Sequence, residues 1–172
     1  MDTDVIHGDI KPQNVLVFKN TFGKATVKVA DFGYSTLAVG EAGNVFLPKS
    51  RPWNAPEHHF GEFKVPEAKK TDVYSFGLLC LWVLFGTVRI PQNTTLCTFD
   101  GSTGPRTSLE HLKDEDKVED FAKHLMESVQ LASFNNEHRT RLKEFFSLTV
   151  PLNPEKRTSN LSRLVGLLSH ER

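Results

Sequence analysis

The sequence has few cysteines, no surplus of charge of either sign, and no apolar segment long enough to cross a membrane. The two cysteines, Cys80 and Cys97, have no spacing that suggests a disulfide framework or a metal site. Lys plus Arg and Asp plus Glu number 21 each, so the formal net charge is zero. Nothing in this balance argues for nucleic acid or an anionic membrane as a partner, and we expect neither.

The N-terminal residues also lack the features of a signal peptide. Met1-Asp2-Thr3-Asp4 has no basic start and is followed by no long apolar stretch. The most apolar segment, residues 73–85, is shorter than the roughly 20 residues that a transmembrane helix needs. We therefore expect a soluble, intracellular protein, located in the cytoplasm.

The chain length of 172 residues suits a single domain, which we expect to span residues 1–172. Residues 15–18 and 26–30 are short apolar runs separated by a polar stretch that contains Asn20 and Gly23, so they predict a β-hairpin. Residues 33–53 are rich in Gly, Ser and Pro without a sustained period. They predict a long loop, and loops of such length often carry function.

The second half of the sequence is predicted to be helical. Thr71 or Asp72 can cap a helix that continues to Phe85, is apolar on nearly every side and is expected to be buried all round. Residues 87–108 contain several Pro and Gly residues and predict a long connector. The fold class is therefore α+β and mainly helical, with short hairpins and a central buried helix.

Three further helices follow from apolar residues at three- and four-residue spacing. They are expected near residues 118–129, near residues 141–148, and after a capping Thr158, where the apolar stripe is Leu161, Leu164, Val165 and Leu168. The charged run from Glu110 to Asp120 is interpreted as a solvated helix face.

One segment carries a pattern of chemistry-bearing residues: His7-Gly8-Asp9-Ile10-Lys11-Pro12-Gln13-Asn14. Asp31-Phe32-Gly33 and Ala55-Pro56-Glu57 follow it. Each residue alone would suit a turn or a solvated loop. The four fixed residues of the first segment match by chance about once in 10^5 positions, so we do not treat the pattern as accidental.

These residue types suit phosphoryl transfer, which depends on positioning and on neutralising charge. Asp9 would orient the attacking hydroxyl or accept its proton, and Lys11 would offset the charge of the transferred phosphate. Asn14 and Asp31 offer hard oxygen ligands for Mg²⁺. The predicted hairpin would bring them to one cleft.

His-x-Asp-x-Lys-x-x-Asn, then Asp-Phe-Gly and Ala-Pro-Glu, closely resembles the signature set of eukaryotic-type protein kinases, and the resemblance extends over the whole chain. It implies the lower, C-terminal lobe of a kinase catalytic domain, with ATP and Mg²⁺ as cofactors. It also implies that Leu16 packs beneath the adenine ring.

The same resemblance assigns structural roles to several residues. Asp72 is expected to hold the backbone of the catalytic loop, and Glu57 is expected to pair with Arg157. His7 and Phe32 are expected to stack in a hydrophobic spine, and Gly33 completes the Asp-Phe-Gly triplet.

The lysine at position 11 resembles the residue found at the matching position in the serine/threonine branch of the family. Ser50, seven residues before Glu57, stands where that branch usually has a Thr that contacts the catalytic Asp and Lys. The expected function is transfer of the ATP γ-phosphate to Ser or Thr hydroxyls of protein substrates.

Three departures from the family pattern change other expectations. Gly8 replaces an Arg that grips a phosphorylated activation loop, so control by such phosphorylation is not expected. Residues 49–54 differ from the usual sequence, so the peptide-docking surface should differ in shape. The six residues before His7 leave no room for a Gly-rich loop or its partner lysine, so we expect the N-terminal lobe to be absent and a longer parent chain or a partner protein to be needed.

Two other functions stay open. A catalytically inactive kinase-like module could bind another protein, since Gly8 and the missing upper lobe are compatible with that role. A kinase-fold enzyme could instead phosphorylate a small molecule, although Ala55-Pro56-Glu57 resembles peptide-docking machinery.

Overall fold

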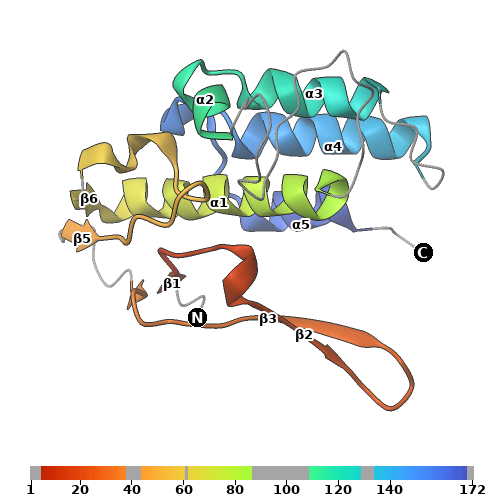
Figure 1. Cartoon of the computed structure of the whole chain (residues 1–172), viewed down its shortest axis with the longest axis horizontal. Helices are drawn as coiled ribbons and strands as arrows, with labels where there is room; N and C mark the ends of the chain where they lie inside the picture. Colours follow the sequence, from red (N-terminus) through yellow and green to blue (C-terminus); the bar gives the residue numbers. More distant parts are fainter. Residues whose placement is uncertain (1–4, 38–43, 61, 87–108, 129–133, 170–172) are drawn as a thin grey trace.

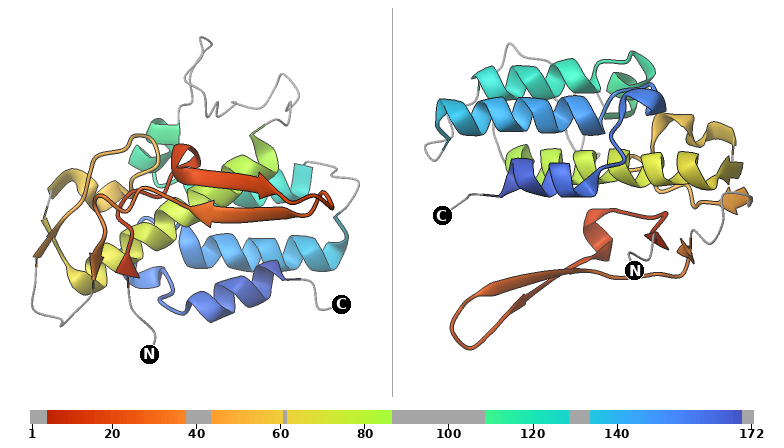
Figure 2. Two further views of the ribbon diagram at one scale, coloured as in Figure 1. Left: turned by 90° about the horizontal axis from the view of Figure 1, so that it is seen from below. Right: turned by 180° about the vertical axis from the view of Figure 1, so that it is seen from behind.

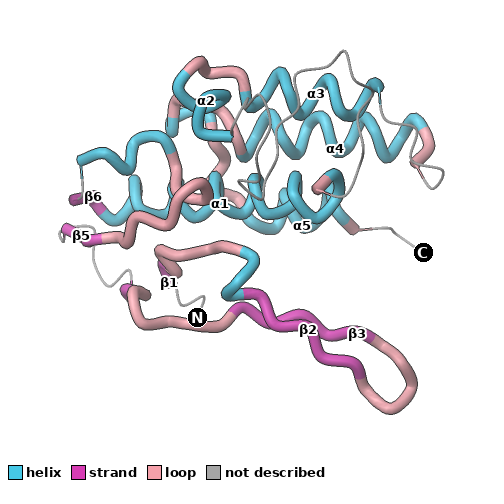
Figure 3. Tube along the Cα trace, viewed as in Figure 1, coloured by secondary structure: helices cyan, strands magenta, loops and turns pink. Residues whose placement is uncertain are grey.

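A computed structural model describes residues 5–37, 44–60, 62–86, 109–128 and 134–169 of the chain. The described part is mainly helical, as predicted, with three two-stranded antiparallel sheets (Figure 3). The helices are α1 (Val65–Phe85), α2 (Leu109–Asp114), α3 (Val118–Ser128), α4 (Asn136–Thr149) and α5 (Leu161–Leu168), with 3₁₀ helices η1 (Pro12–Asn14), η2 (Pro56–Phe60) and η3 (Pro154–Lys156). The paired strands are β1 (Val5–Ile6) with β4 (Thr36–Leu37), β2 (Val15–Lys19) with β3 (Ala25–Val29), and β5 (Asn44–Phe46) with β6 (Glu62–Lys64).

Helix α1 forms the middle layer of the molecule (Figure 1). Helices α3 and α4 lie together on one side of it, and α5 packs against α4. The strands β1, β2 and β3 lie on the other side. The main hydrophobic core joins apolar residues of α1 to those of α2, α3 and α4, while a smaller cluster around Ile6, Val45 and Phe63 packs against the first turns of α1.

The predicted central helix is present, but its predicted start is wrong. α1 begins at Val65, and its first turn contains Pro66 and the capping residue Glu67, whose carboxylate accepts the backbone N–H of Lys64 at 3.0 Å. Thr71 and Asp72 therefore lie inside the helix. The helix is also not buried all round, because Trp82 and Val83 are 38% and 65% exposed.

The three later helices are placed close to their predictions, with two corrections. α3 confirms the helix expected near residues 118–129, and α4 is longer than expected. The cap of α5 is Asn160 and not Thr158, because the Asn160 side chain accepts the backbone N–H of Arg163 at 3.0 Å. Of the predicted apolar stripe on α5, Leu164 alone is buried.

The predicted hairpin is confirmed as β2 and β3, in the register Val15 to Val29 and Val17 to Val27. Its turn is stabilised by Asn20, whose side chain accepts the backbone N–H groups of Phe22 and Lys24, and by Gly23 at a φ of 76°. The hairpin leaves the body on the side away from α3 and α4 (Figure 2). Both of its faces are exposed.

The segment predicted as a loop, residues 33–53, contains two short strands, β4 and β5, in its described part. The connector predicted at residues 87–108 lies outside the described residues. Among the helices that the structure describes, none has the length and apolar character required to cross a lipid bilayer.

Candidate active site

Asp72 fixes the backbone at the start of the segment from His7 to Asn14. From the interior of α1, its two carboxylate oxygens accept the backbone N–H groups of His7 at 2.6 Å and Gly8 at 2.9 Å. Burial raises the pKa of Asp72, although the two N–H donors act in the opposite direction. These bonds join the central helix to the first residues of the motif.

The His7 ring links this segment to the residues that follow β3, at the open end of the hairpin. Its Nδ1 accepts the backbone N–H of Asp9 at 3.2 Å, which leaves Nε2–H to donate to the carbonyl of Ala30 at 3.0 Å. The ring also contacts Phe32, with centroids 5.0 Å apart and a tilt of 58°. His7 is buried, while Phe32 is exposed on its other side.

Gly8, which departs from the family pattern, has a backbone reason to be glycine. Its φ is 79°, in the left-handed region that side chains rarely adopt. A Cβ at this position would approach Leu47 Cδ2 to 2.8 Å. A larger residue would require both strain and a shift of Leu47.

Asp9, Lys11, Asn14 and Ser50 form one hydrogen-bonded cluster. Lys11 Nζ donates to Asp9 Oδ2 at 2.7 Å and to Ser50 Oγ at 3.0 Å. Asn14 Nδ2 donates to the Asp9 carbonyl at 2.8 Å and to Asp9 Oδ2 at 3.2 Å. The sequence reasoning named all four residues, and the structure brings them together.

The cluster keeps Asp9 ionised although the residue is buried. Burial alone would raise the pKa of Asp9, but hydrogen bonds from Lys11, Ser50 and Asn14, together with the Lys11 charge, hold it below its usual value. A buried carboxylate that stays charged can accept a proton from a hydroxyl group.

Asn14 and Asp31 meet at the same end of the hairpin. The backbone N–H of Ala30 donates to the Asn14 carbonyl at 2.8 Å, so Asp31, the next residue, follows directly after the strand pairing that begins at Asn14. Asp31 has a φ of 64° and its Oδ1 accepts the Gly33 N–H at 3.3 Å. With Asn14 Nδ2 engaged by Asp9, its amide oxygen is left for another partner, and amide and carboxylate oxygens such as those of Asn14 and Asp31 are the hard ligands that Mg²⁺ prefers.

Glu57 and Arg157, which were expected to pair, form a bidentate ion pair. Arg157 Nη1 lies 2.5 Å from Glu57 Oε1, and Nη2 lies 2.9 Å from Oε2. The buried guanidinium also donates to the carbonyls of Pro151, Lys70 and Leu152 and lies 4.6 Å from the centre of the Tyr74 ring. The pair joins the start of η2 to the segment that precedes α5.

Lys113 is a buried residue that the sequence reasoning missed, because the run from Glu110 to Asp120 was interpreted as a solvated face. Its ammonium donates to the carbonyls of Pro52 and Asn54 and lies 5.7 Å from the centre of the Tyr74 ring. A signal was present: Leu109, Leu112 and Lys113 share one face of a helix. Burial lowers the pKa of Lys113 to about 8.

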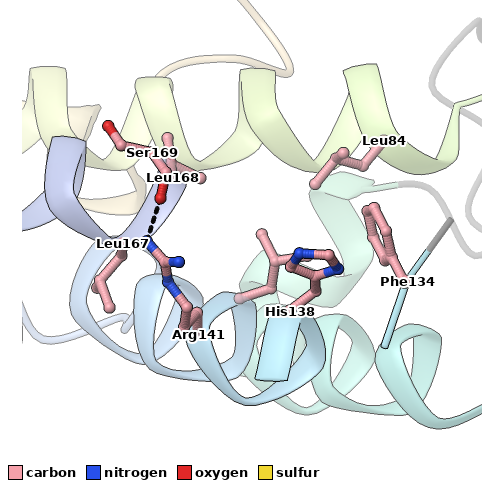
Figure 4. Close-up of a pocket in the computed structure, with 8 residues that line it drawn as sticks. Leu84, Phe134, His138, Arg141, Leu167, Leu168 and Ser169 are labelled. Atoms are coloured by element: carbon pink, nitrogen blue, oxygen red, sulfur yellow. Dashed lines mark hydrogen bonds between the residues drawn. The ribbon is translucent and has the colours of Figure 1, made fainter. Parts of the chain in front are cut away.

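A cavity lies between the helices of the body (Figure 4). It has a volume of about 340 Å³ and lies between the end of α1, the first half of α4 and the end of α5. Arg141 closes one side of it by donating to the carbonyls of Gly166 and Ser169. None of its lining residues belongs to the cluster around Asp9.

Comparison with known proteins agrees with this geometry. Residues 2–169 match the family described as the protein kinase domain. The chain is 42% identical over 81 residues to the dual specificity protein kinase shkD of Dictyostelium discoideum, and 43% identical over 84 residues to the serine/threonine-protein kinase CTR1 of Arabidopsis thaliana; each match covers 46% of this chain. It is 31% identical over 126 residues, 73% of this chain, to the probable serine/threonine-protein kinase gdt8 of Dictyostelium discoideum.

These matches cover 10%, 9% and 9% of the lengths of shkD, CTR1 and gdt8, so the chain spans about a tenth of the curated relatives. The family match, in contrast, extends over nearly the whole of this chain. The chain belongs to the protein kinase family.

Proposed function

We propose that this chain is the larger lobe of a serine/threonine protein kinase, and that it transfers the γ-phosphate of ATP to hydroxyl groups of protein substrates. The observation that carries the proposal is the cluster in which Lys11 bonds both Asp9 and Ser50 while Asn14 holds the same Asp9 oxygen. A cluster of this kind places a carboxylate, an ammonium group and an amide at one point, which phosphoryl transfer requires.

In this reaction the substrate hydroxyl oxygen bonds to the γ-phosphorus as the bond to the leaving ADP breaks. Asp9 takes the hydroxyl proton, and Lys11 offsets charge on the transferred group. Asn14 and Asp31 would hold Mg²⁺, which neutralises the phosphates of bound ATP. Leu16, which is 45% exposed next to Asn14 and Val15, would provide an apolar contact for the adenine ring.

The choice of Ser or Thr as acceptor rests on Ser50 and on the names of relatives. The Ser50 hydroxyl bonds to Lys11, as expected for the serine/threonine branch. CTR1 and gdt8 are serine/threonine kinases by name, whereas shkD is named a dual specificity kinase. A peptide panel with Ser, Thr and Tyr acceptors tests this choice.

Complete activity should require a further lobe, from a longer chain or from a partner protein. Support comes from the exposed apolar side chains beside the cluster, including Leu16, Val17 and Phe32. Gly8 carries no cation for an activation-loop phosphate, so regulation should come from another source.

Thermal unfolding of the 172-residue chain in a titration with Mg-ATP tests the nucleotide site. A ligand that binds only the folded state stabilises it, by about 2.7 kcal/mol at a concentration 100 times the Kd. We expect stabilisation in the wild type and in Asp120→Asn, which changes an exposed aspartate on α3, and none in Asp31→Asn. Equal stabilisation of all three proteins would contradict a site at Asp31.

Phosphotransfer assays then test the chemistry. We expect Asp9→Asn to lower the rate about 10²- to 10⁴-fold while the protein stays folded. Undiminished transfer by this variant would contradict the assigned role of Asp9. A chain with neither nucleotide-dependent stabilisation nor transfer would not be the active unit alone, and would act either with its further lobe or as an interaction module.

A further inference from the structure

Three buried side-chain atoms in the described residues have no hydrogen-bond partner: Asp9 Oδ1, Asn54 Oδ1 and His58 Nδ1. All three residues line the same small cavity, which has a volume of about 10 Å³. They reach it from different parts of the chain, since Asp9 belongs to the catalytic motif, Asn54 precedes η2 and His58 lies within η2. Buried polar atoms are rarely left unpaired, so three around one cavity require a common explanation.

The cavity has the size and the polarity for one water molecule. A buried water requires about 10–15 Å³ and two to four polar partners. Asp9 Oδ1, Asn54 Oδ1 and His58 Nδ1 supply three. An apolar cavity of this kind would stay dry, but this one is lined by a carboxylate, an amide and an imidazole.

We propose that one buried water molecule occupies this cavity and joins Asp9 to Asn54 and His58. Water donates one hydrogen to Asp9 Oδ1 and the other to Asn54 Oδ1, and it accepts Nδ1–H from His58. This arrangement uses two donors and one acceptor of the water and satisfies all three protein atoms.

The neighbouring bonds fix these directions. Asn54 Nδ2 donates to the Ala55 carbonyl at 3.3 Å, which leaves the amide oxygen for the cavity. Asp9 is ionised and can only accept. His58 must then supply a proton, and it does so as the neutral ring, because burial lowers the pKa of His58.

Water fits this site better than a cation. The Asp9 charge is already offset by Lys11, whose Nζ lies 2.7 Å from Oδ2. The described residues also contain no group of three or more His, Cys, Asp or Glu side chains that could hold a metal ion. A neutral molecule that donates two hydrogen bonds meets the needs of the site without adding charge.

The water would hold the second oxygen of Asp9. Lys11 and Asn14 hold Oδ2, so the water at Oδ1 would leave the carboxylate no freedom to rotate. Asn54 and His58 thereby become positioning residues that join η2 to the catalytic motif. The positioning role of Asn54 and His58 in catalysis rests on the proposed function, whereas the presence of the water does not depend on it.

NMR of the 172-residue chain labelled with ¹⁵N-histidine tests the water directly, and it requires no activity. We expect His58 to carry a proton on Nδ1 and to show a nuclear Overhauser effect from that proton to a long-lived water. The resonance is assigned by its disappearance in His58→Leu. An Nδ1 without a proton, or a proton without a water contact, would overturn the proposal.

Kinetics of three variants test the positioning role. His58→Asn retains an N–H donor and should keep most of the wild-type kcat, whereas His58→Leu should lower kcat about 10- to 100-fold with the KM for ATP unchanged. His124→Leu, at an exposed position on α3, is the matched control and should retain the wild-type kcat. Equal kcat values for the Leu and Asn variants at position 58 would overturn the positioning role. If neither the wild type nor any variant transfers phosphate, this chain alone is not the active unit, and the NMR result still decides the water site.

Discussion

At the scale of single residues, Lys113 shows how a buried charge can join two segments. Its ammonium lies among Glu110, Asp114 and Glu57, which favour the charged form, and near Arg51, which opposes it. Desolvation outweighs these charges, so the pKa of Lys113 falls from 10.5 to about 8. Its hydrogen bonds to the carbonyls of Pro52 and Asn54 hold the segment that follows Ser50 against α2.

This shift predicts how stability depends on pH. In the unfolded chain the lysine loses its proton near pH 10.5, but in the folded chain it does so near pH 8. Between these values the unfolded state binds more protons, so the free energy of unfolding should rise with pH, and this gain should be lost as the pH falls through about 8. A pKa difference of one corresponds to about 1.4 kcal/mol.

Urea unfolding of wild type and Lys113→Met across this pH window measures the effect. The variant cannot titrate at this position, so the wild type should gain stability relative to it as the pH rises. Lys117→Met is the matched control, because the Lys117 side chain is 58% exposed and pairs with Glu115. Its difference from the wild type should stay constant. A constant difference for Lys113→Met as well would mean that position 113 is not desolvated.

At the scale of elements, Gly77 sets how closely α1 and α4 approach. A Cβ at Gly77 would lie 2.6 Å from Thr149 Oγ1 and 2.7 Å from Val150 Cγ1, at the end of α4. Gly166 in α5 is the opposite case, since a Cβ there meets nothing within 4 Å. The two glycines therefore separate the effect of packing from the effect of helix propensity.

We expect Gly77→Ala to lower the free energy of unfolding by about 1–3 kcal/mol, because overpacking outweighs the better helix propensity of Ala. Gly166→Ala should instead raise it by up to about 1 kcal/mol. Urea unfolding of the two variants beside the wild type gives the signs. A gain in stability for both would show that α1 and α4 have room at position 77.

The elements show why sequence patterns predict some features and miss others. The apolar run that ends at Phe85 predicted α1. Asp72 was mistaken for its N-cap, because an aspartate carboxylate can accept backbone N–H groups either at a helix start or from a distant segment. Asp72 bonds His7 and Gly8, which lie 65 and 64 positions earlier; helical periodicity does not reveal these bonds, and the expectation that Asp72 holds this backbone came from the resemblance to protein kinases. On α5, Leu161, Val165 and Leu168 have helical spacing yet are exposed, because periodicity identifies an apolar face without showing what covers it.

The candidate site also contains residues that the sequence predicted and residues that it did not. Asp9, Lys11 and Asn14 lie within six residues of a motif that resembles the kinase signature, so the sequence predicted that they would act at one site. Asn54 and His58 join the same site only through the path of the chain between Ser50 and η2. The local sequence around them carries no period, so their part in the site could not be predicted.

At the scale of the whole molecule, a helical body with a large core carries a hairpin that shares little of that core. Val17 and Val27 pair across the hairpin and are 62% and 60% exposed. The opposite face carries Leu16 and Phe18, which are also exposed. A two-stranded hairpin without a covered face is only marginally stable in water.

Because the hairpin shares little of the core, its local stability and the stability of the body should vary independently. The amides of β2 and β3 should exchange with deuterium far faster than those of α1 and α4, because the strands bury little apolar surface. Replacing Val17 and Val27 together by Thr keeps side chains suited to strands, so the free energy of unfolding of the body should change by less than about 0.5 kcal/mol. Binding of a hydrophobic dye should fall in this double variant and should fall less in Val83→Thr, which alters one exposed valine on α1. Slow exchange in the strands, or a large loss of stability in the double variant, would instead show that the hairpin packs against the body.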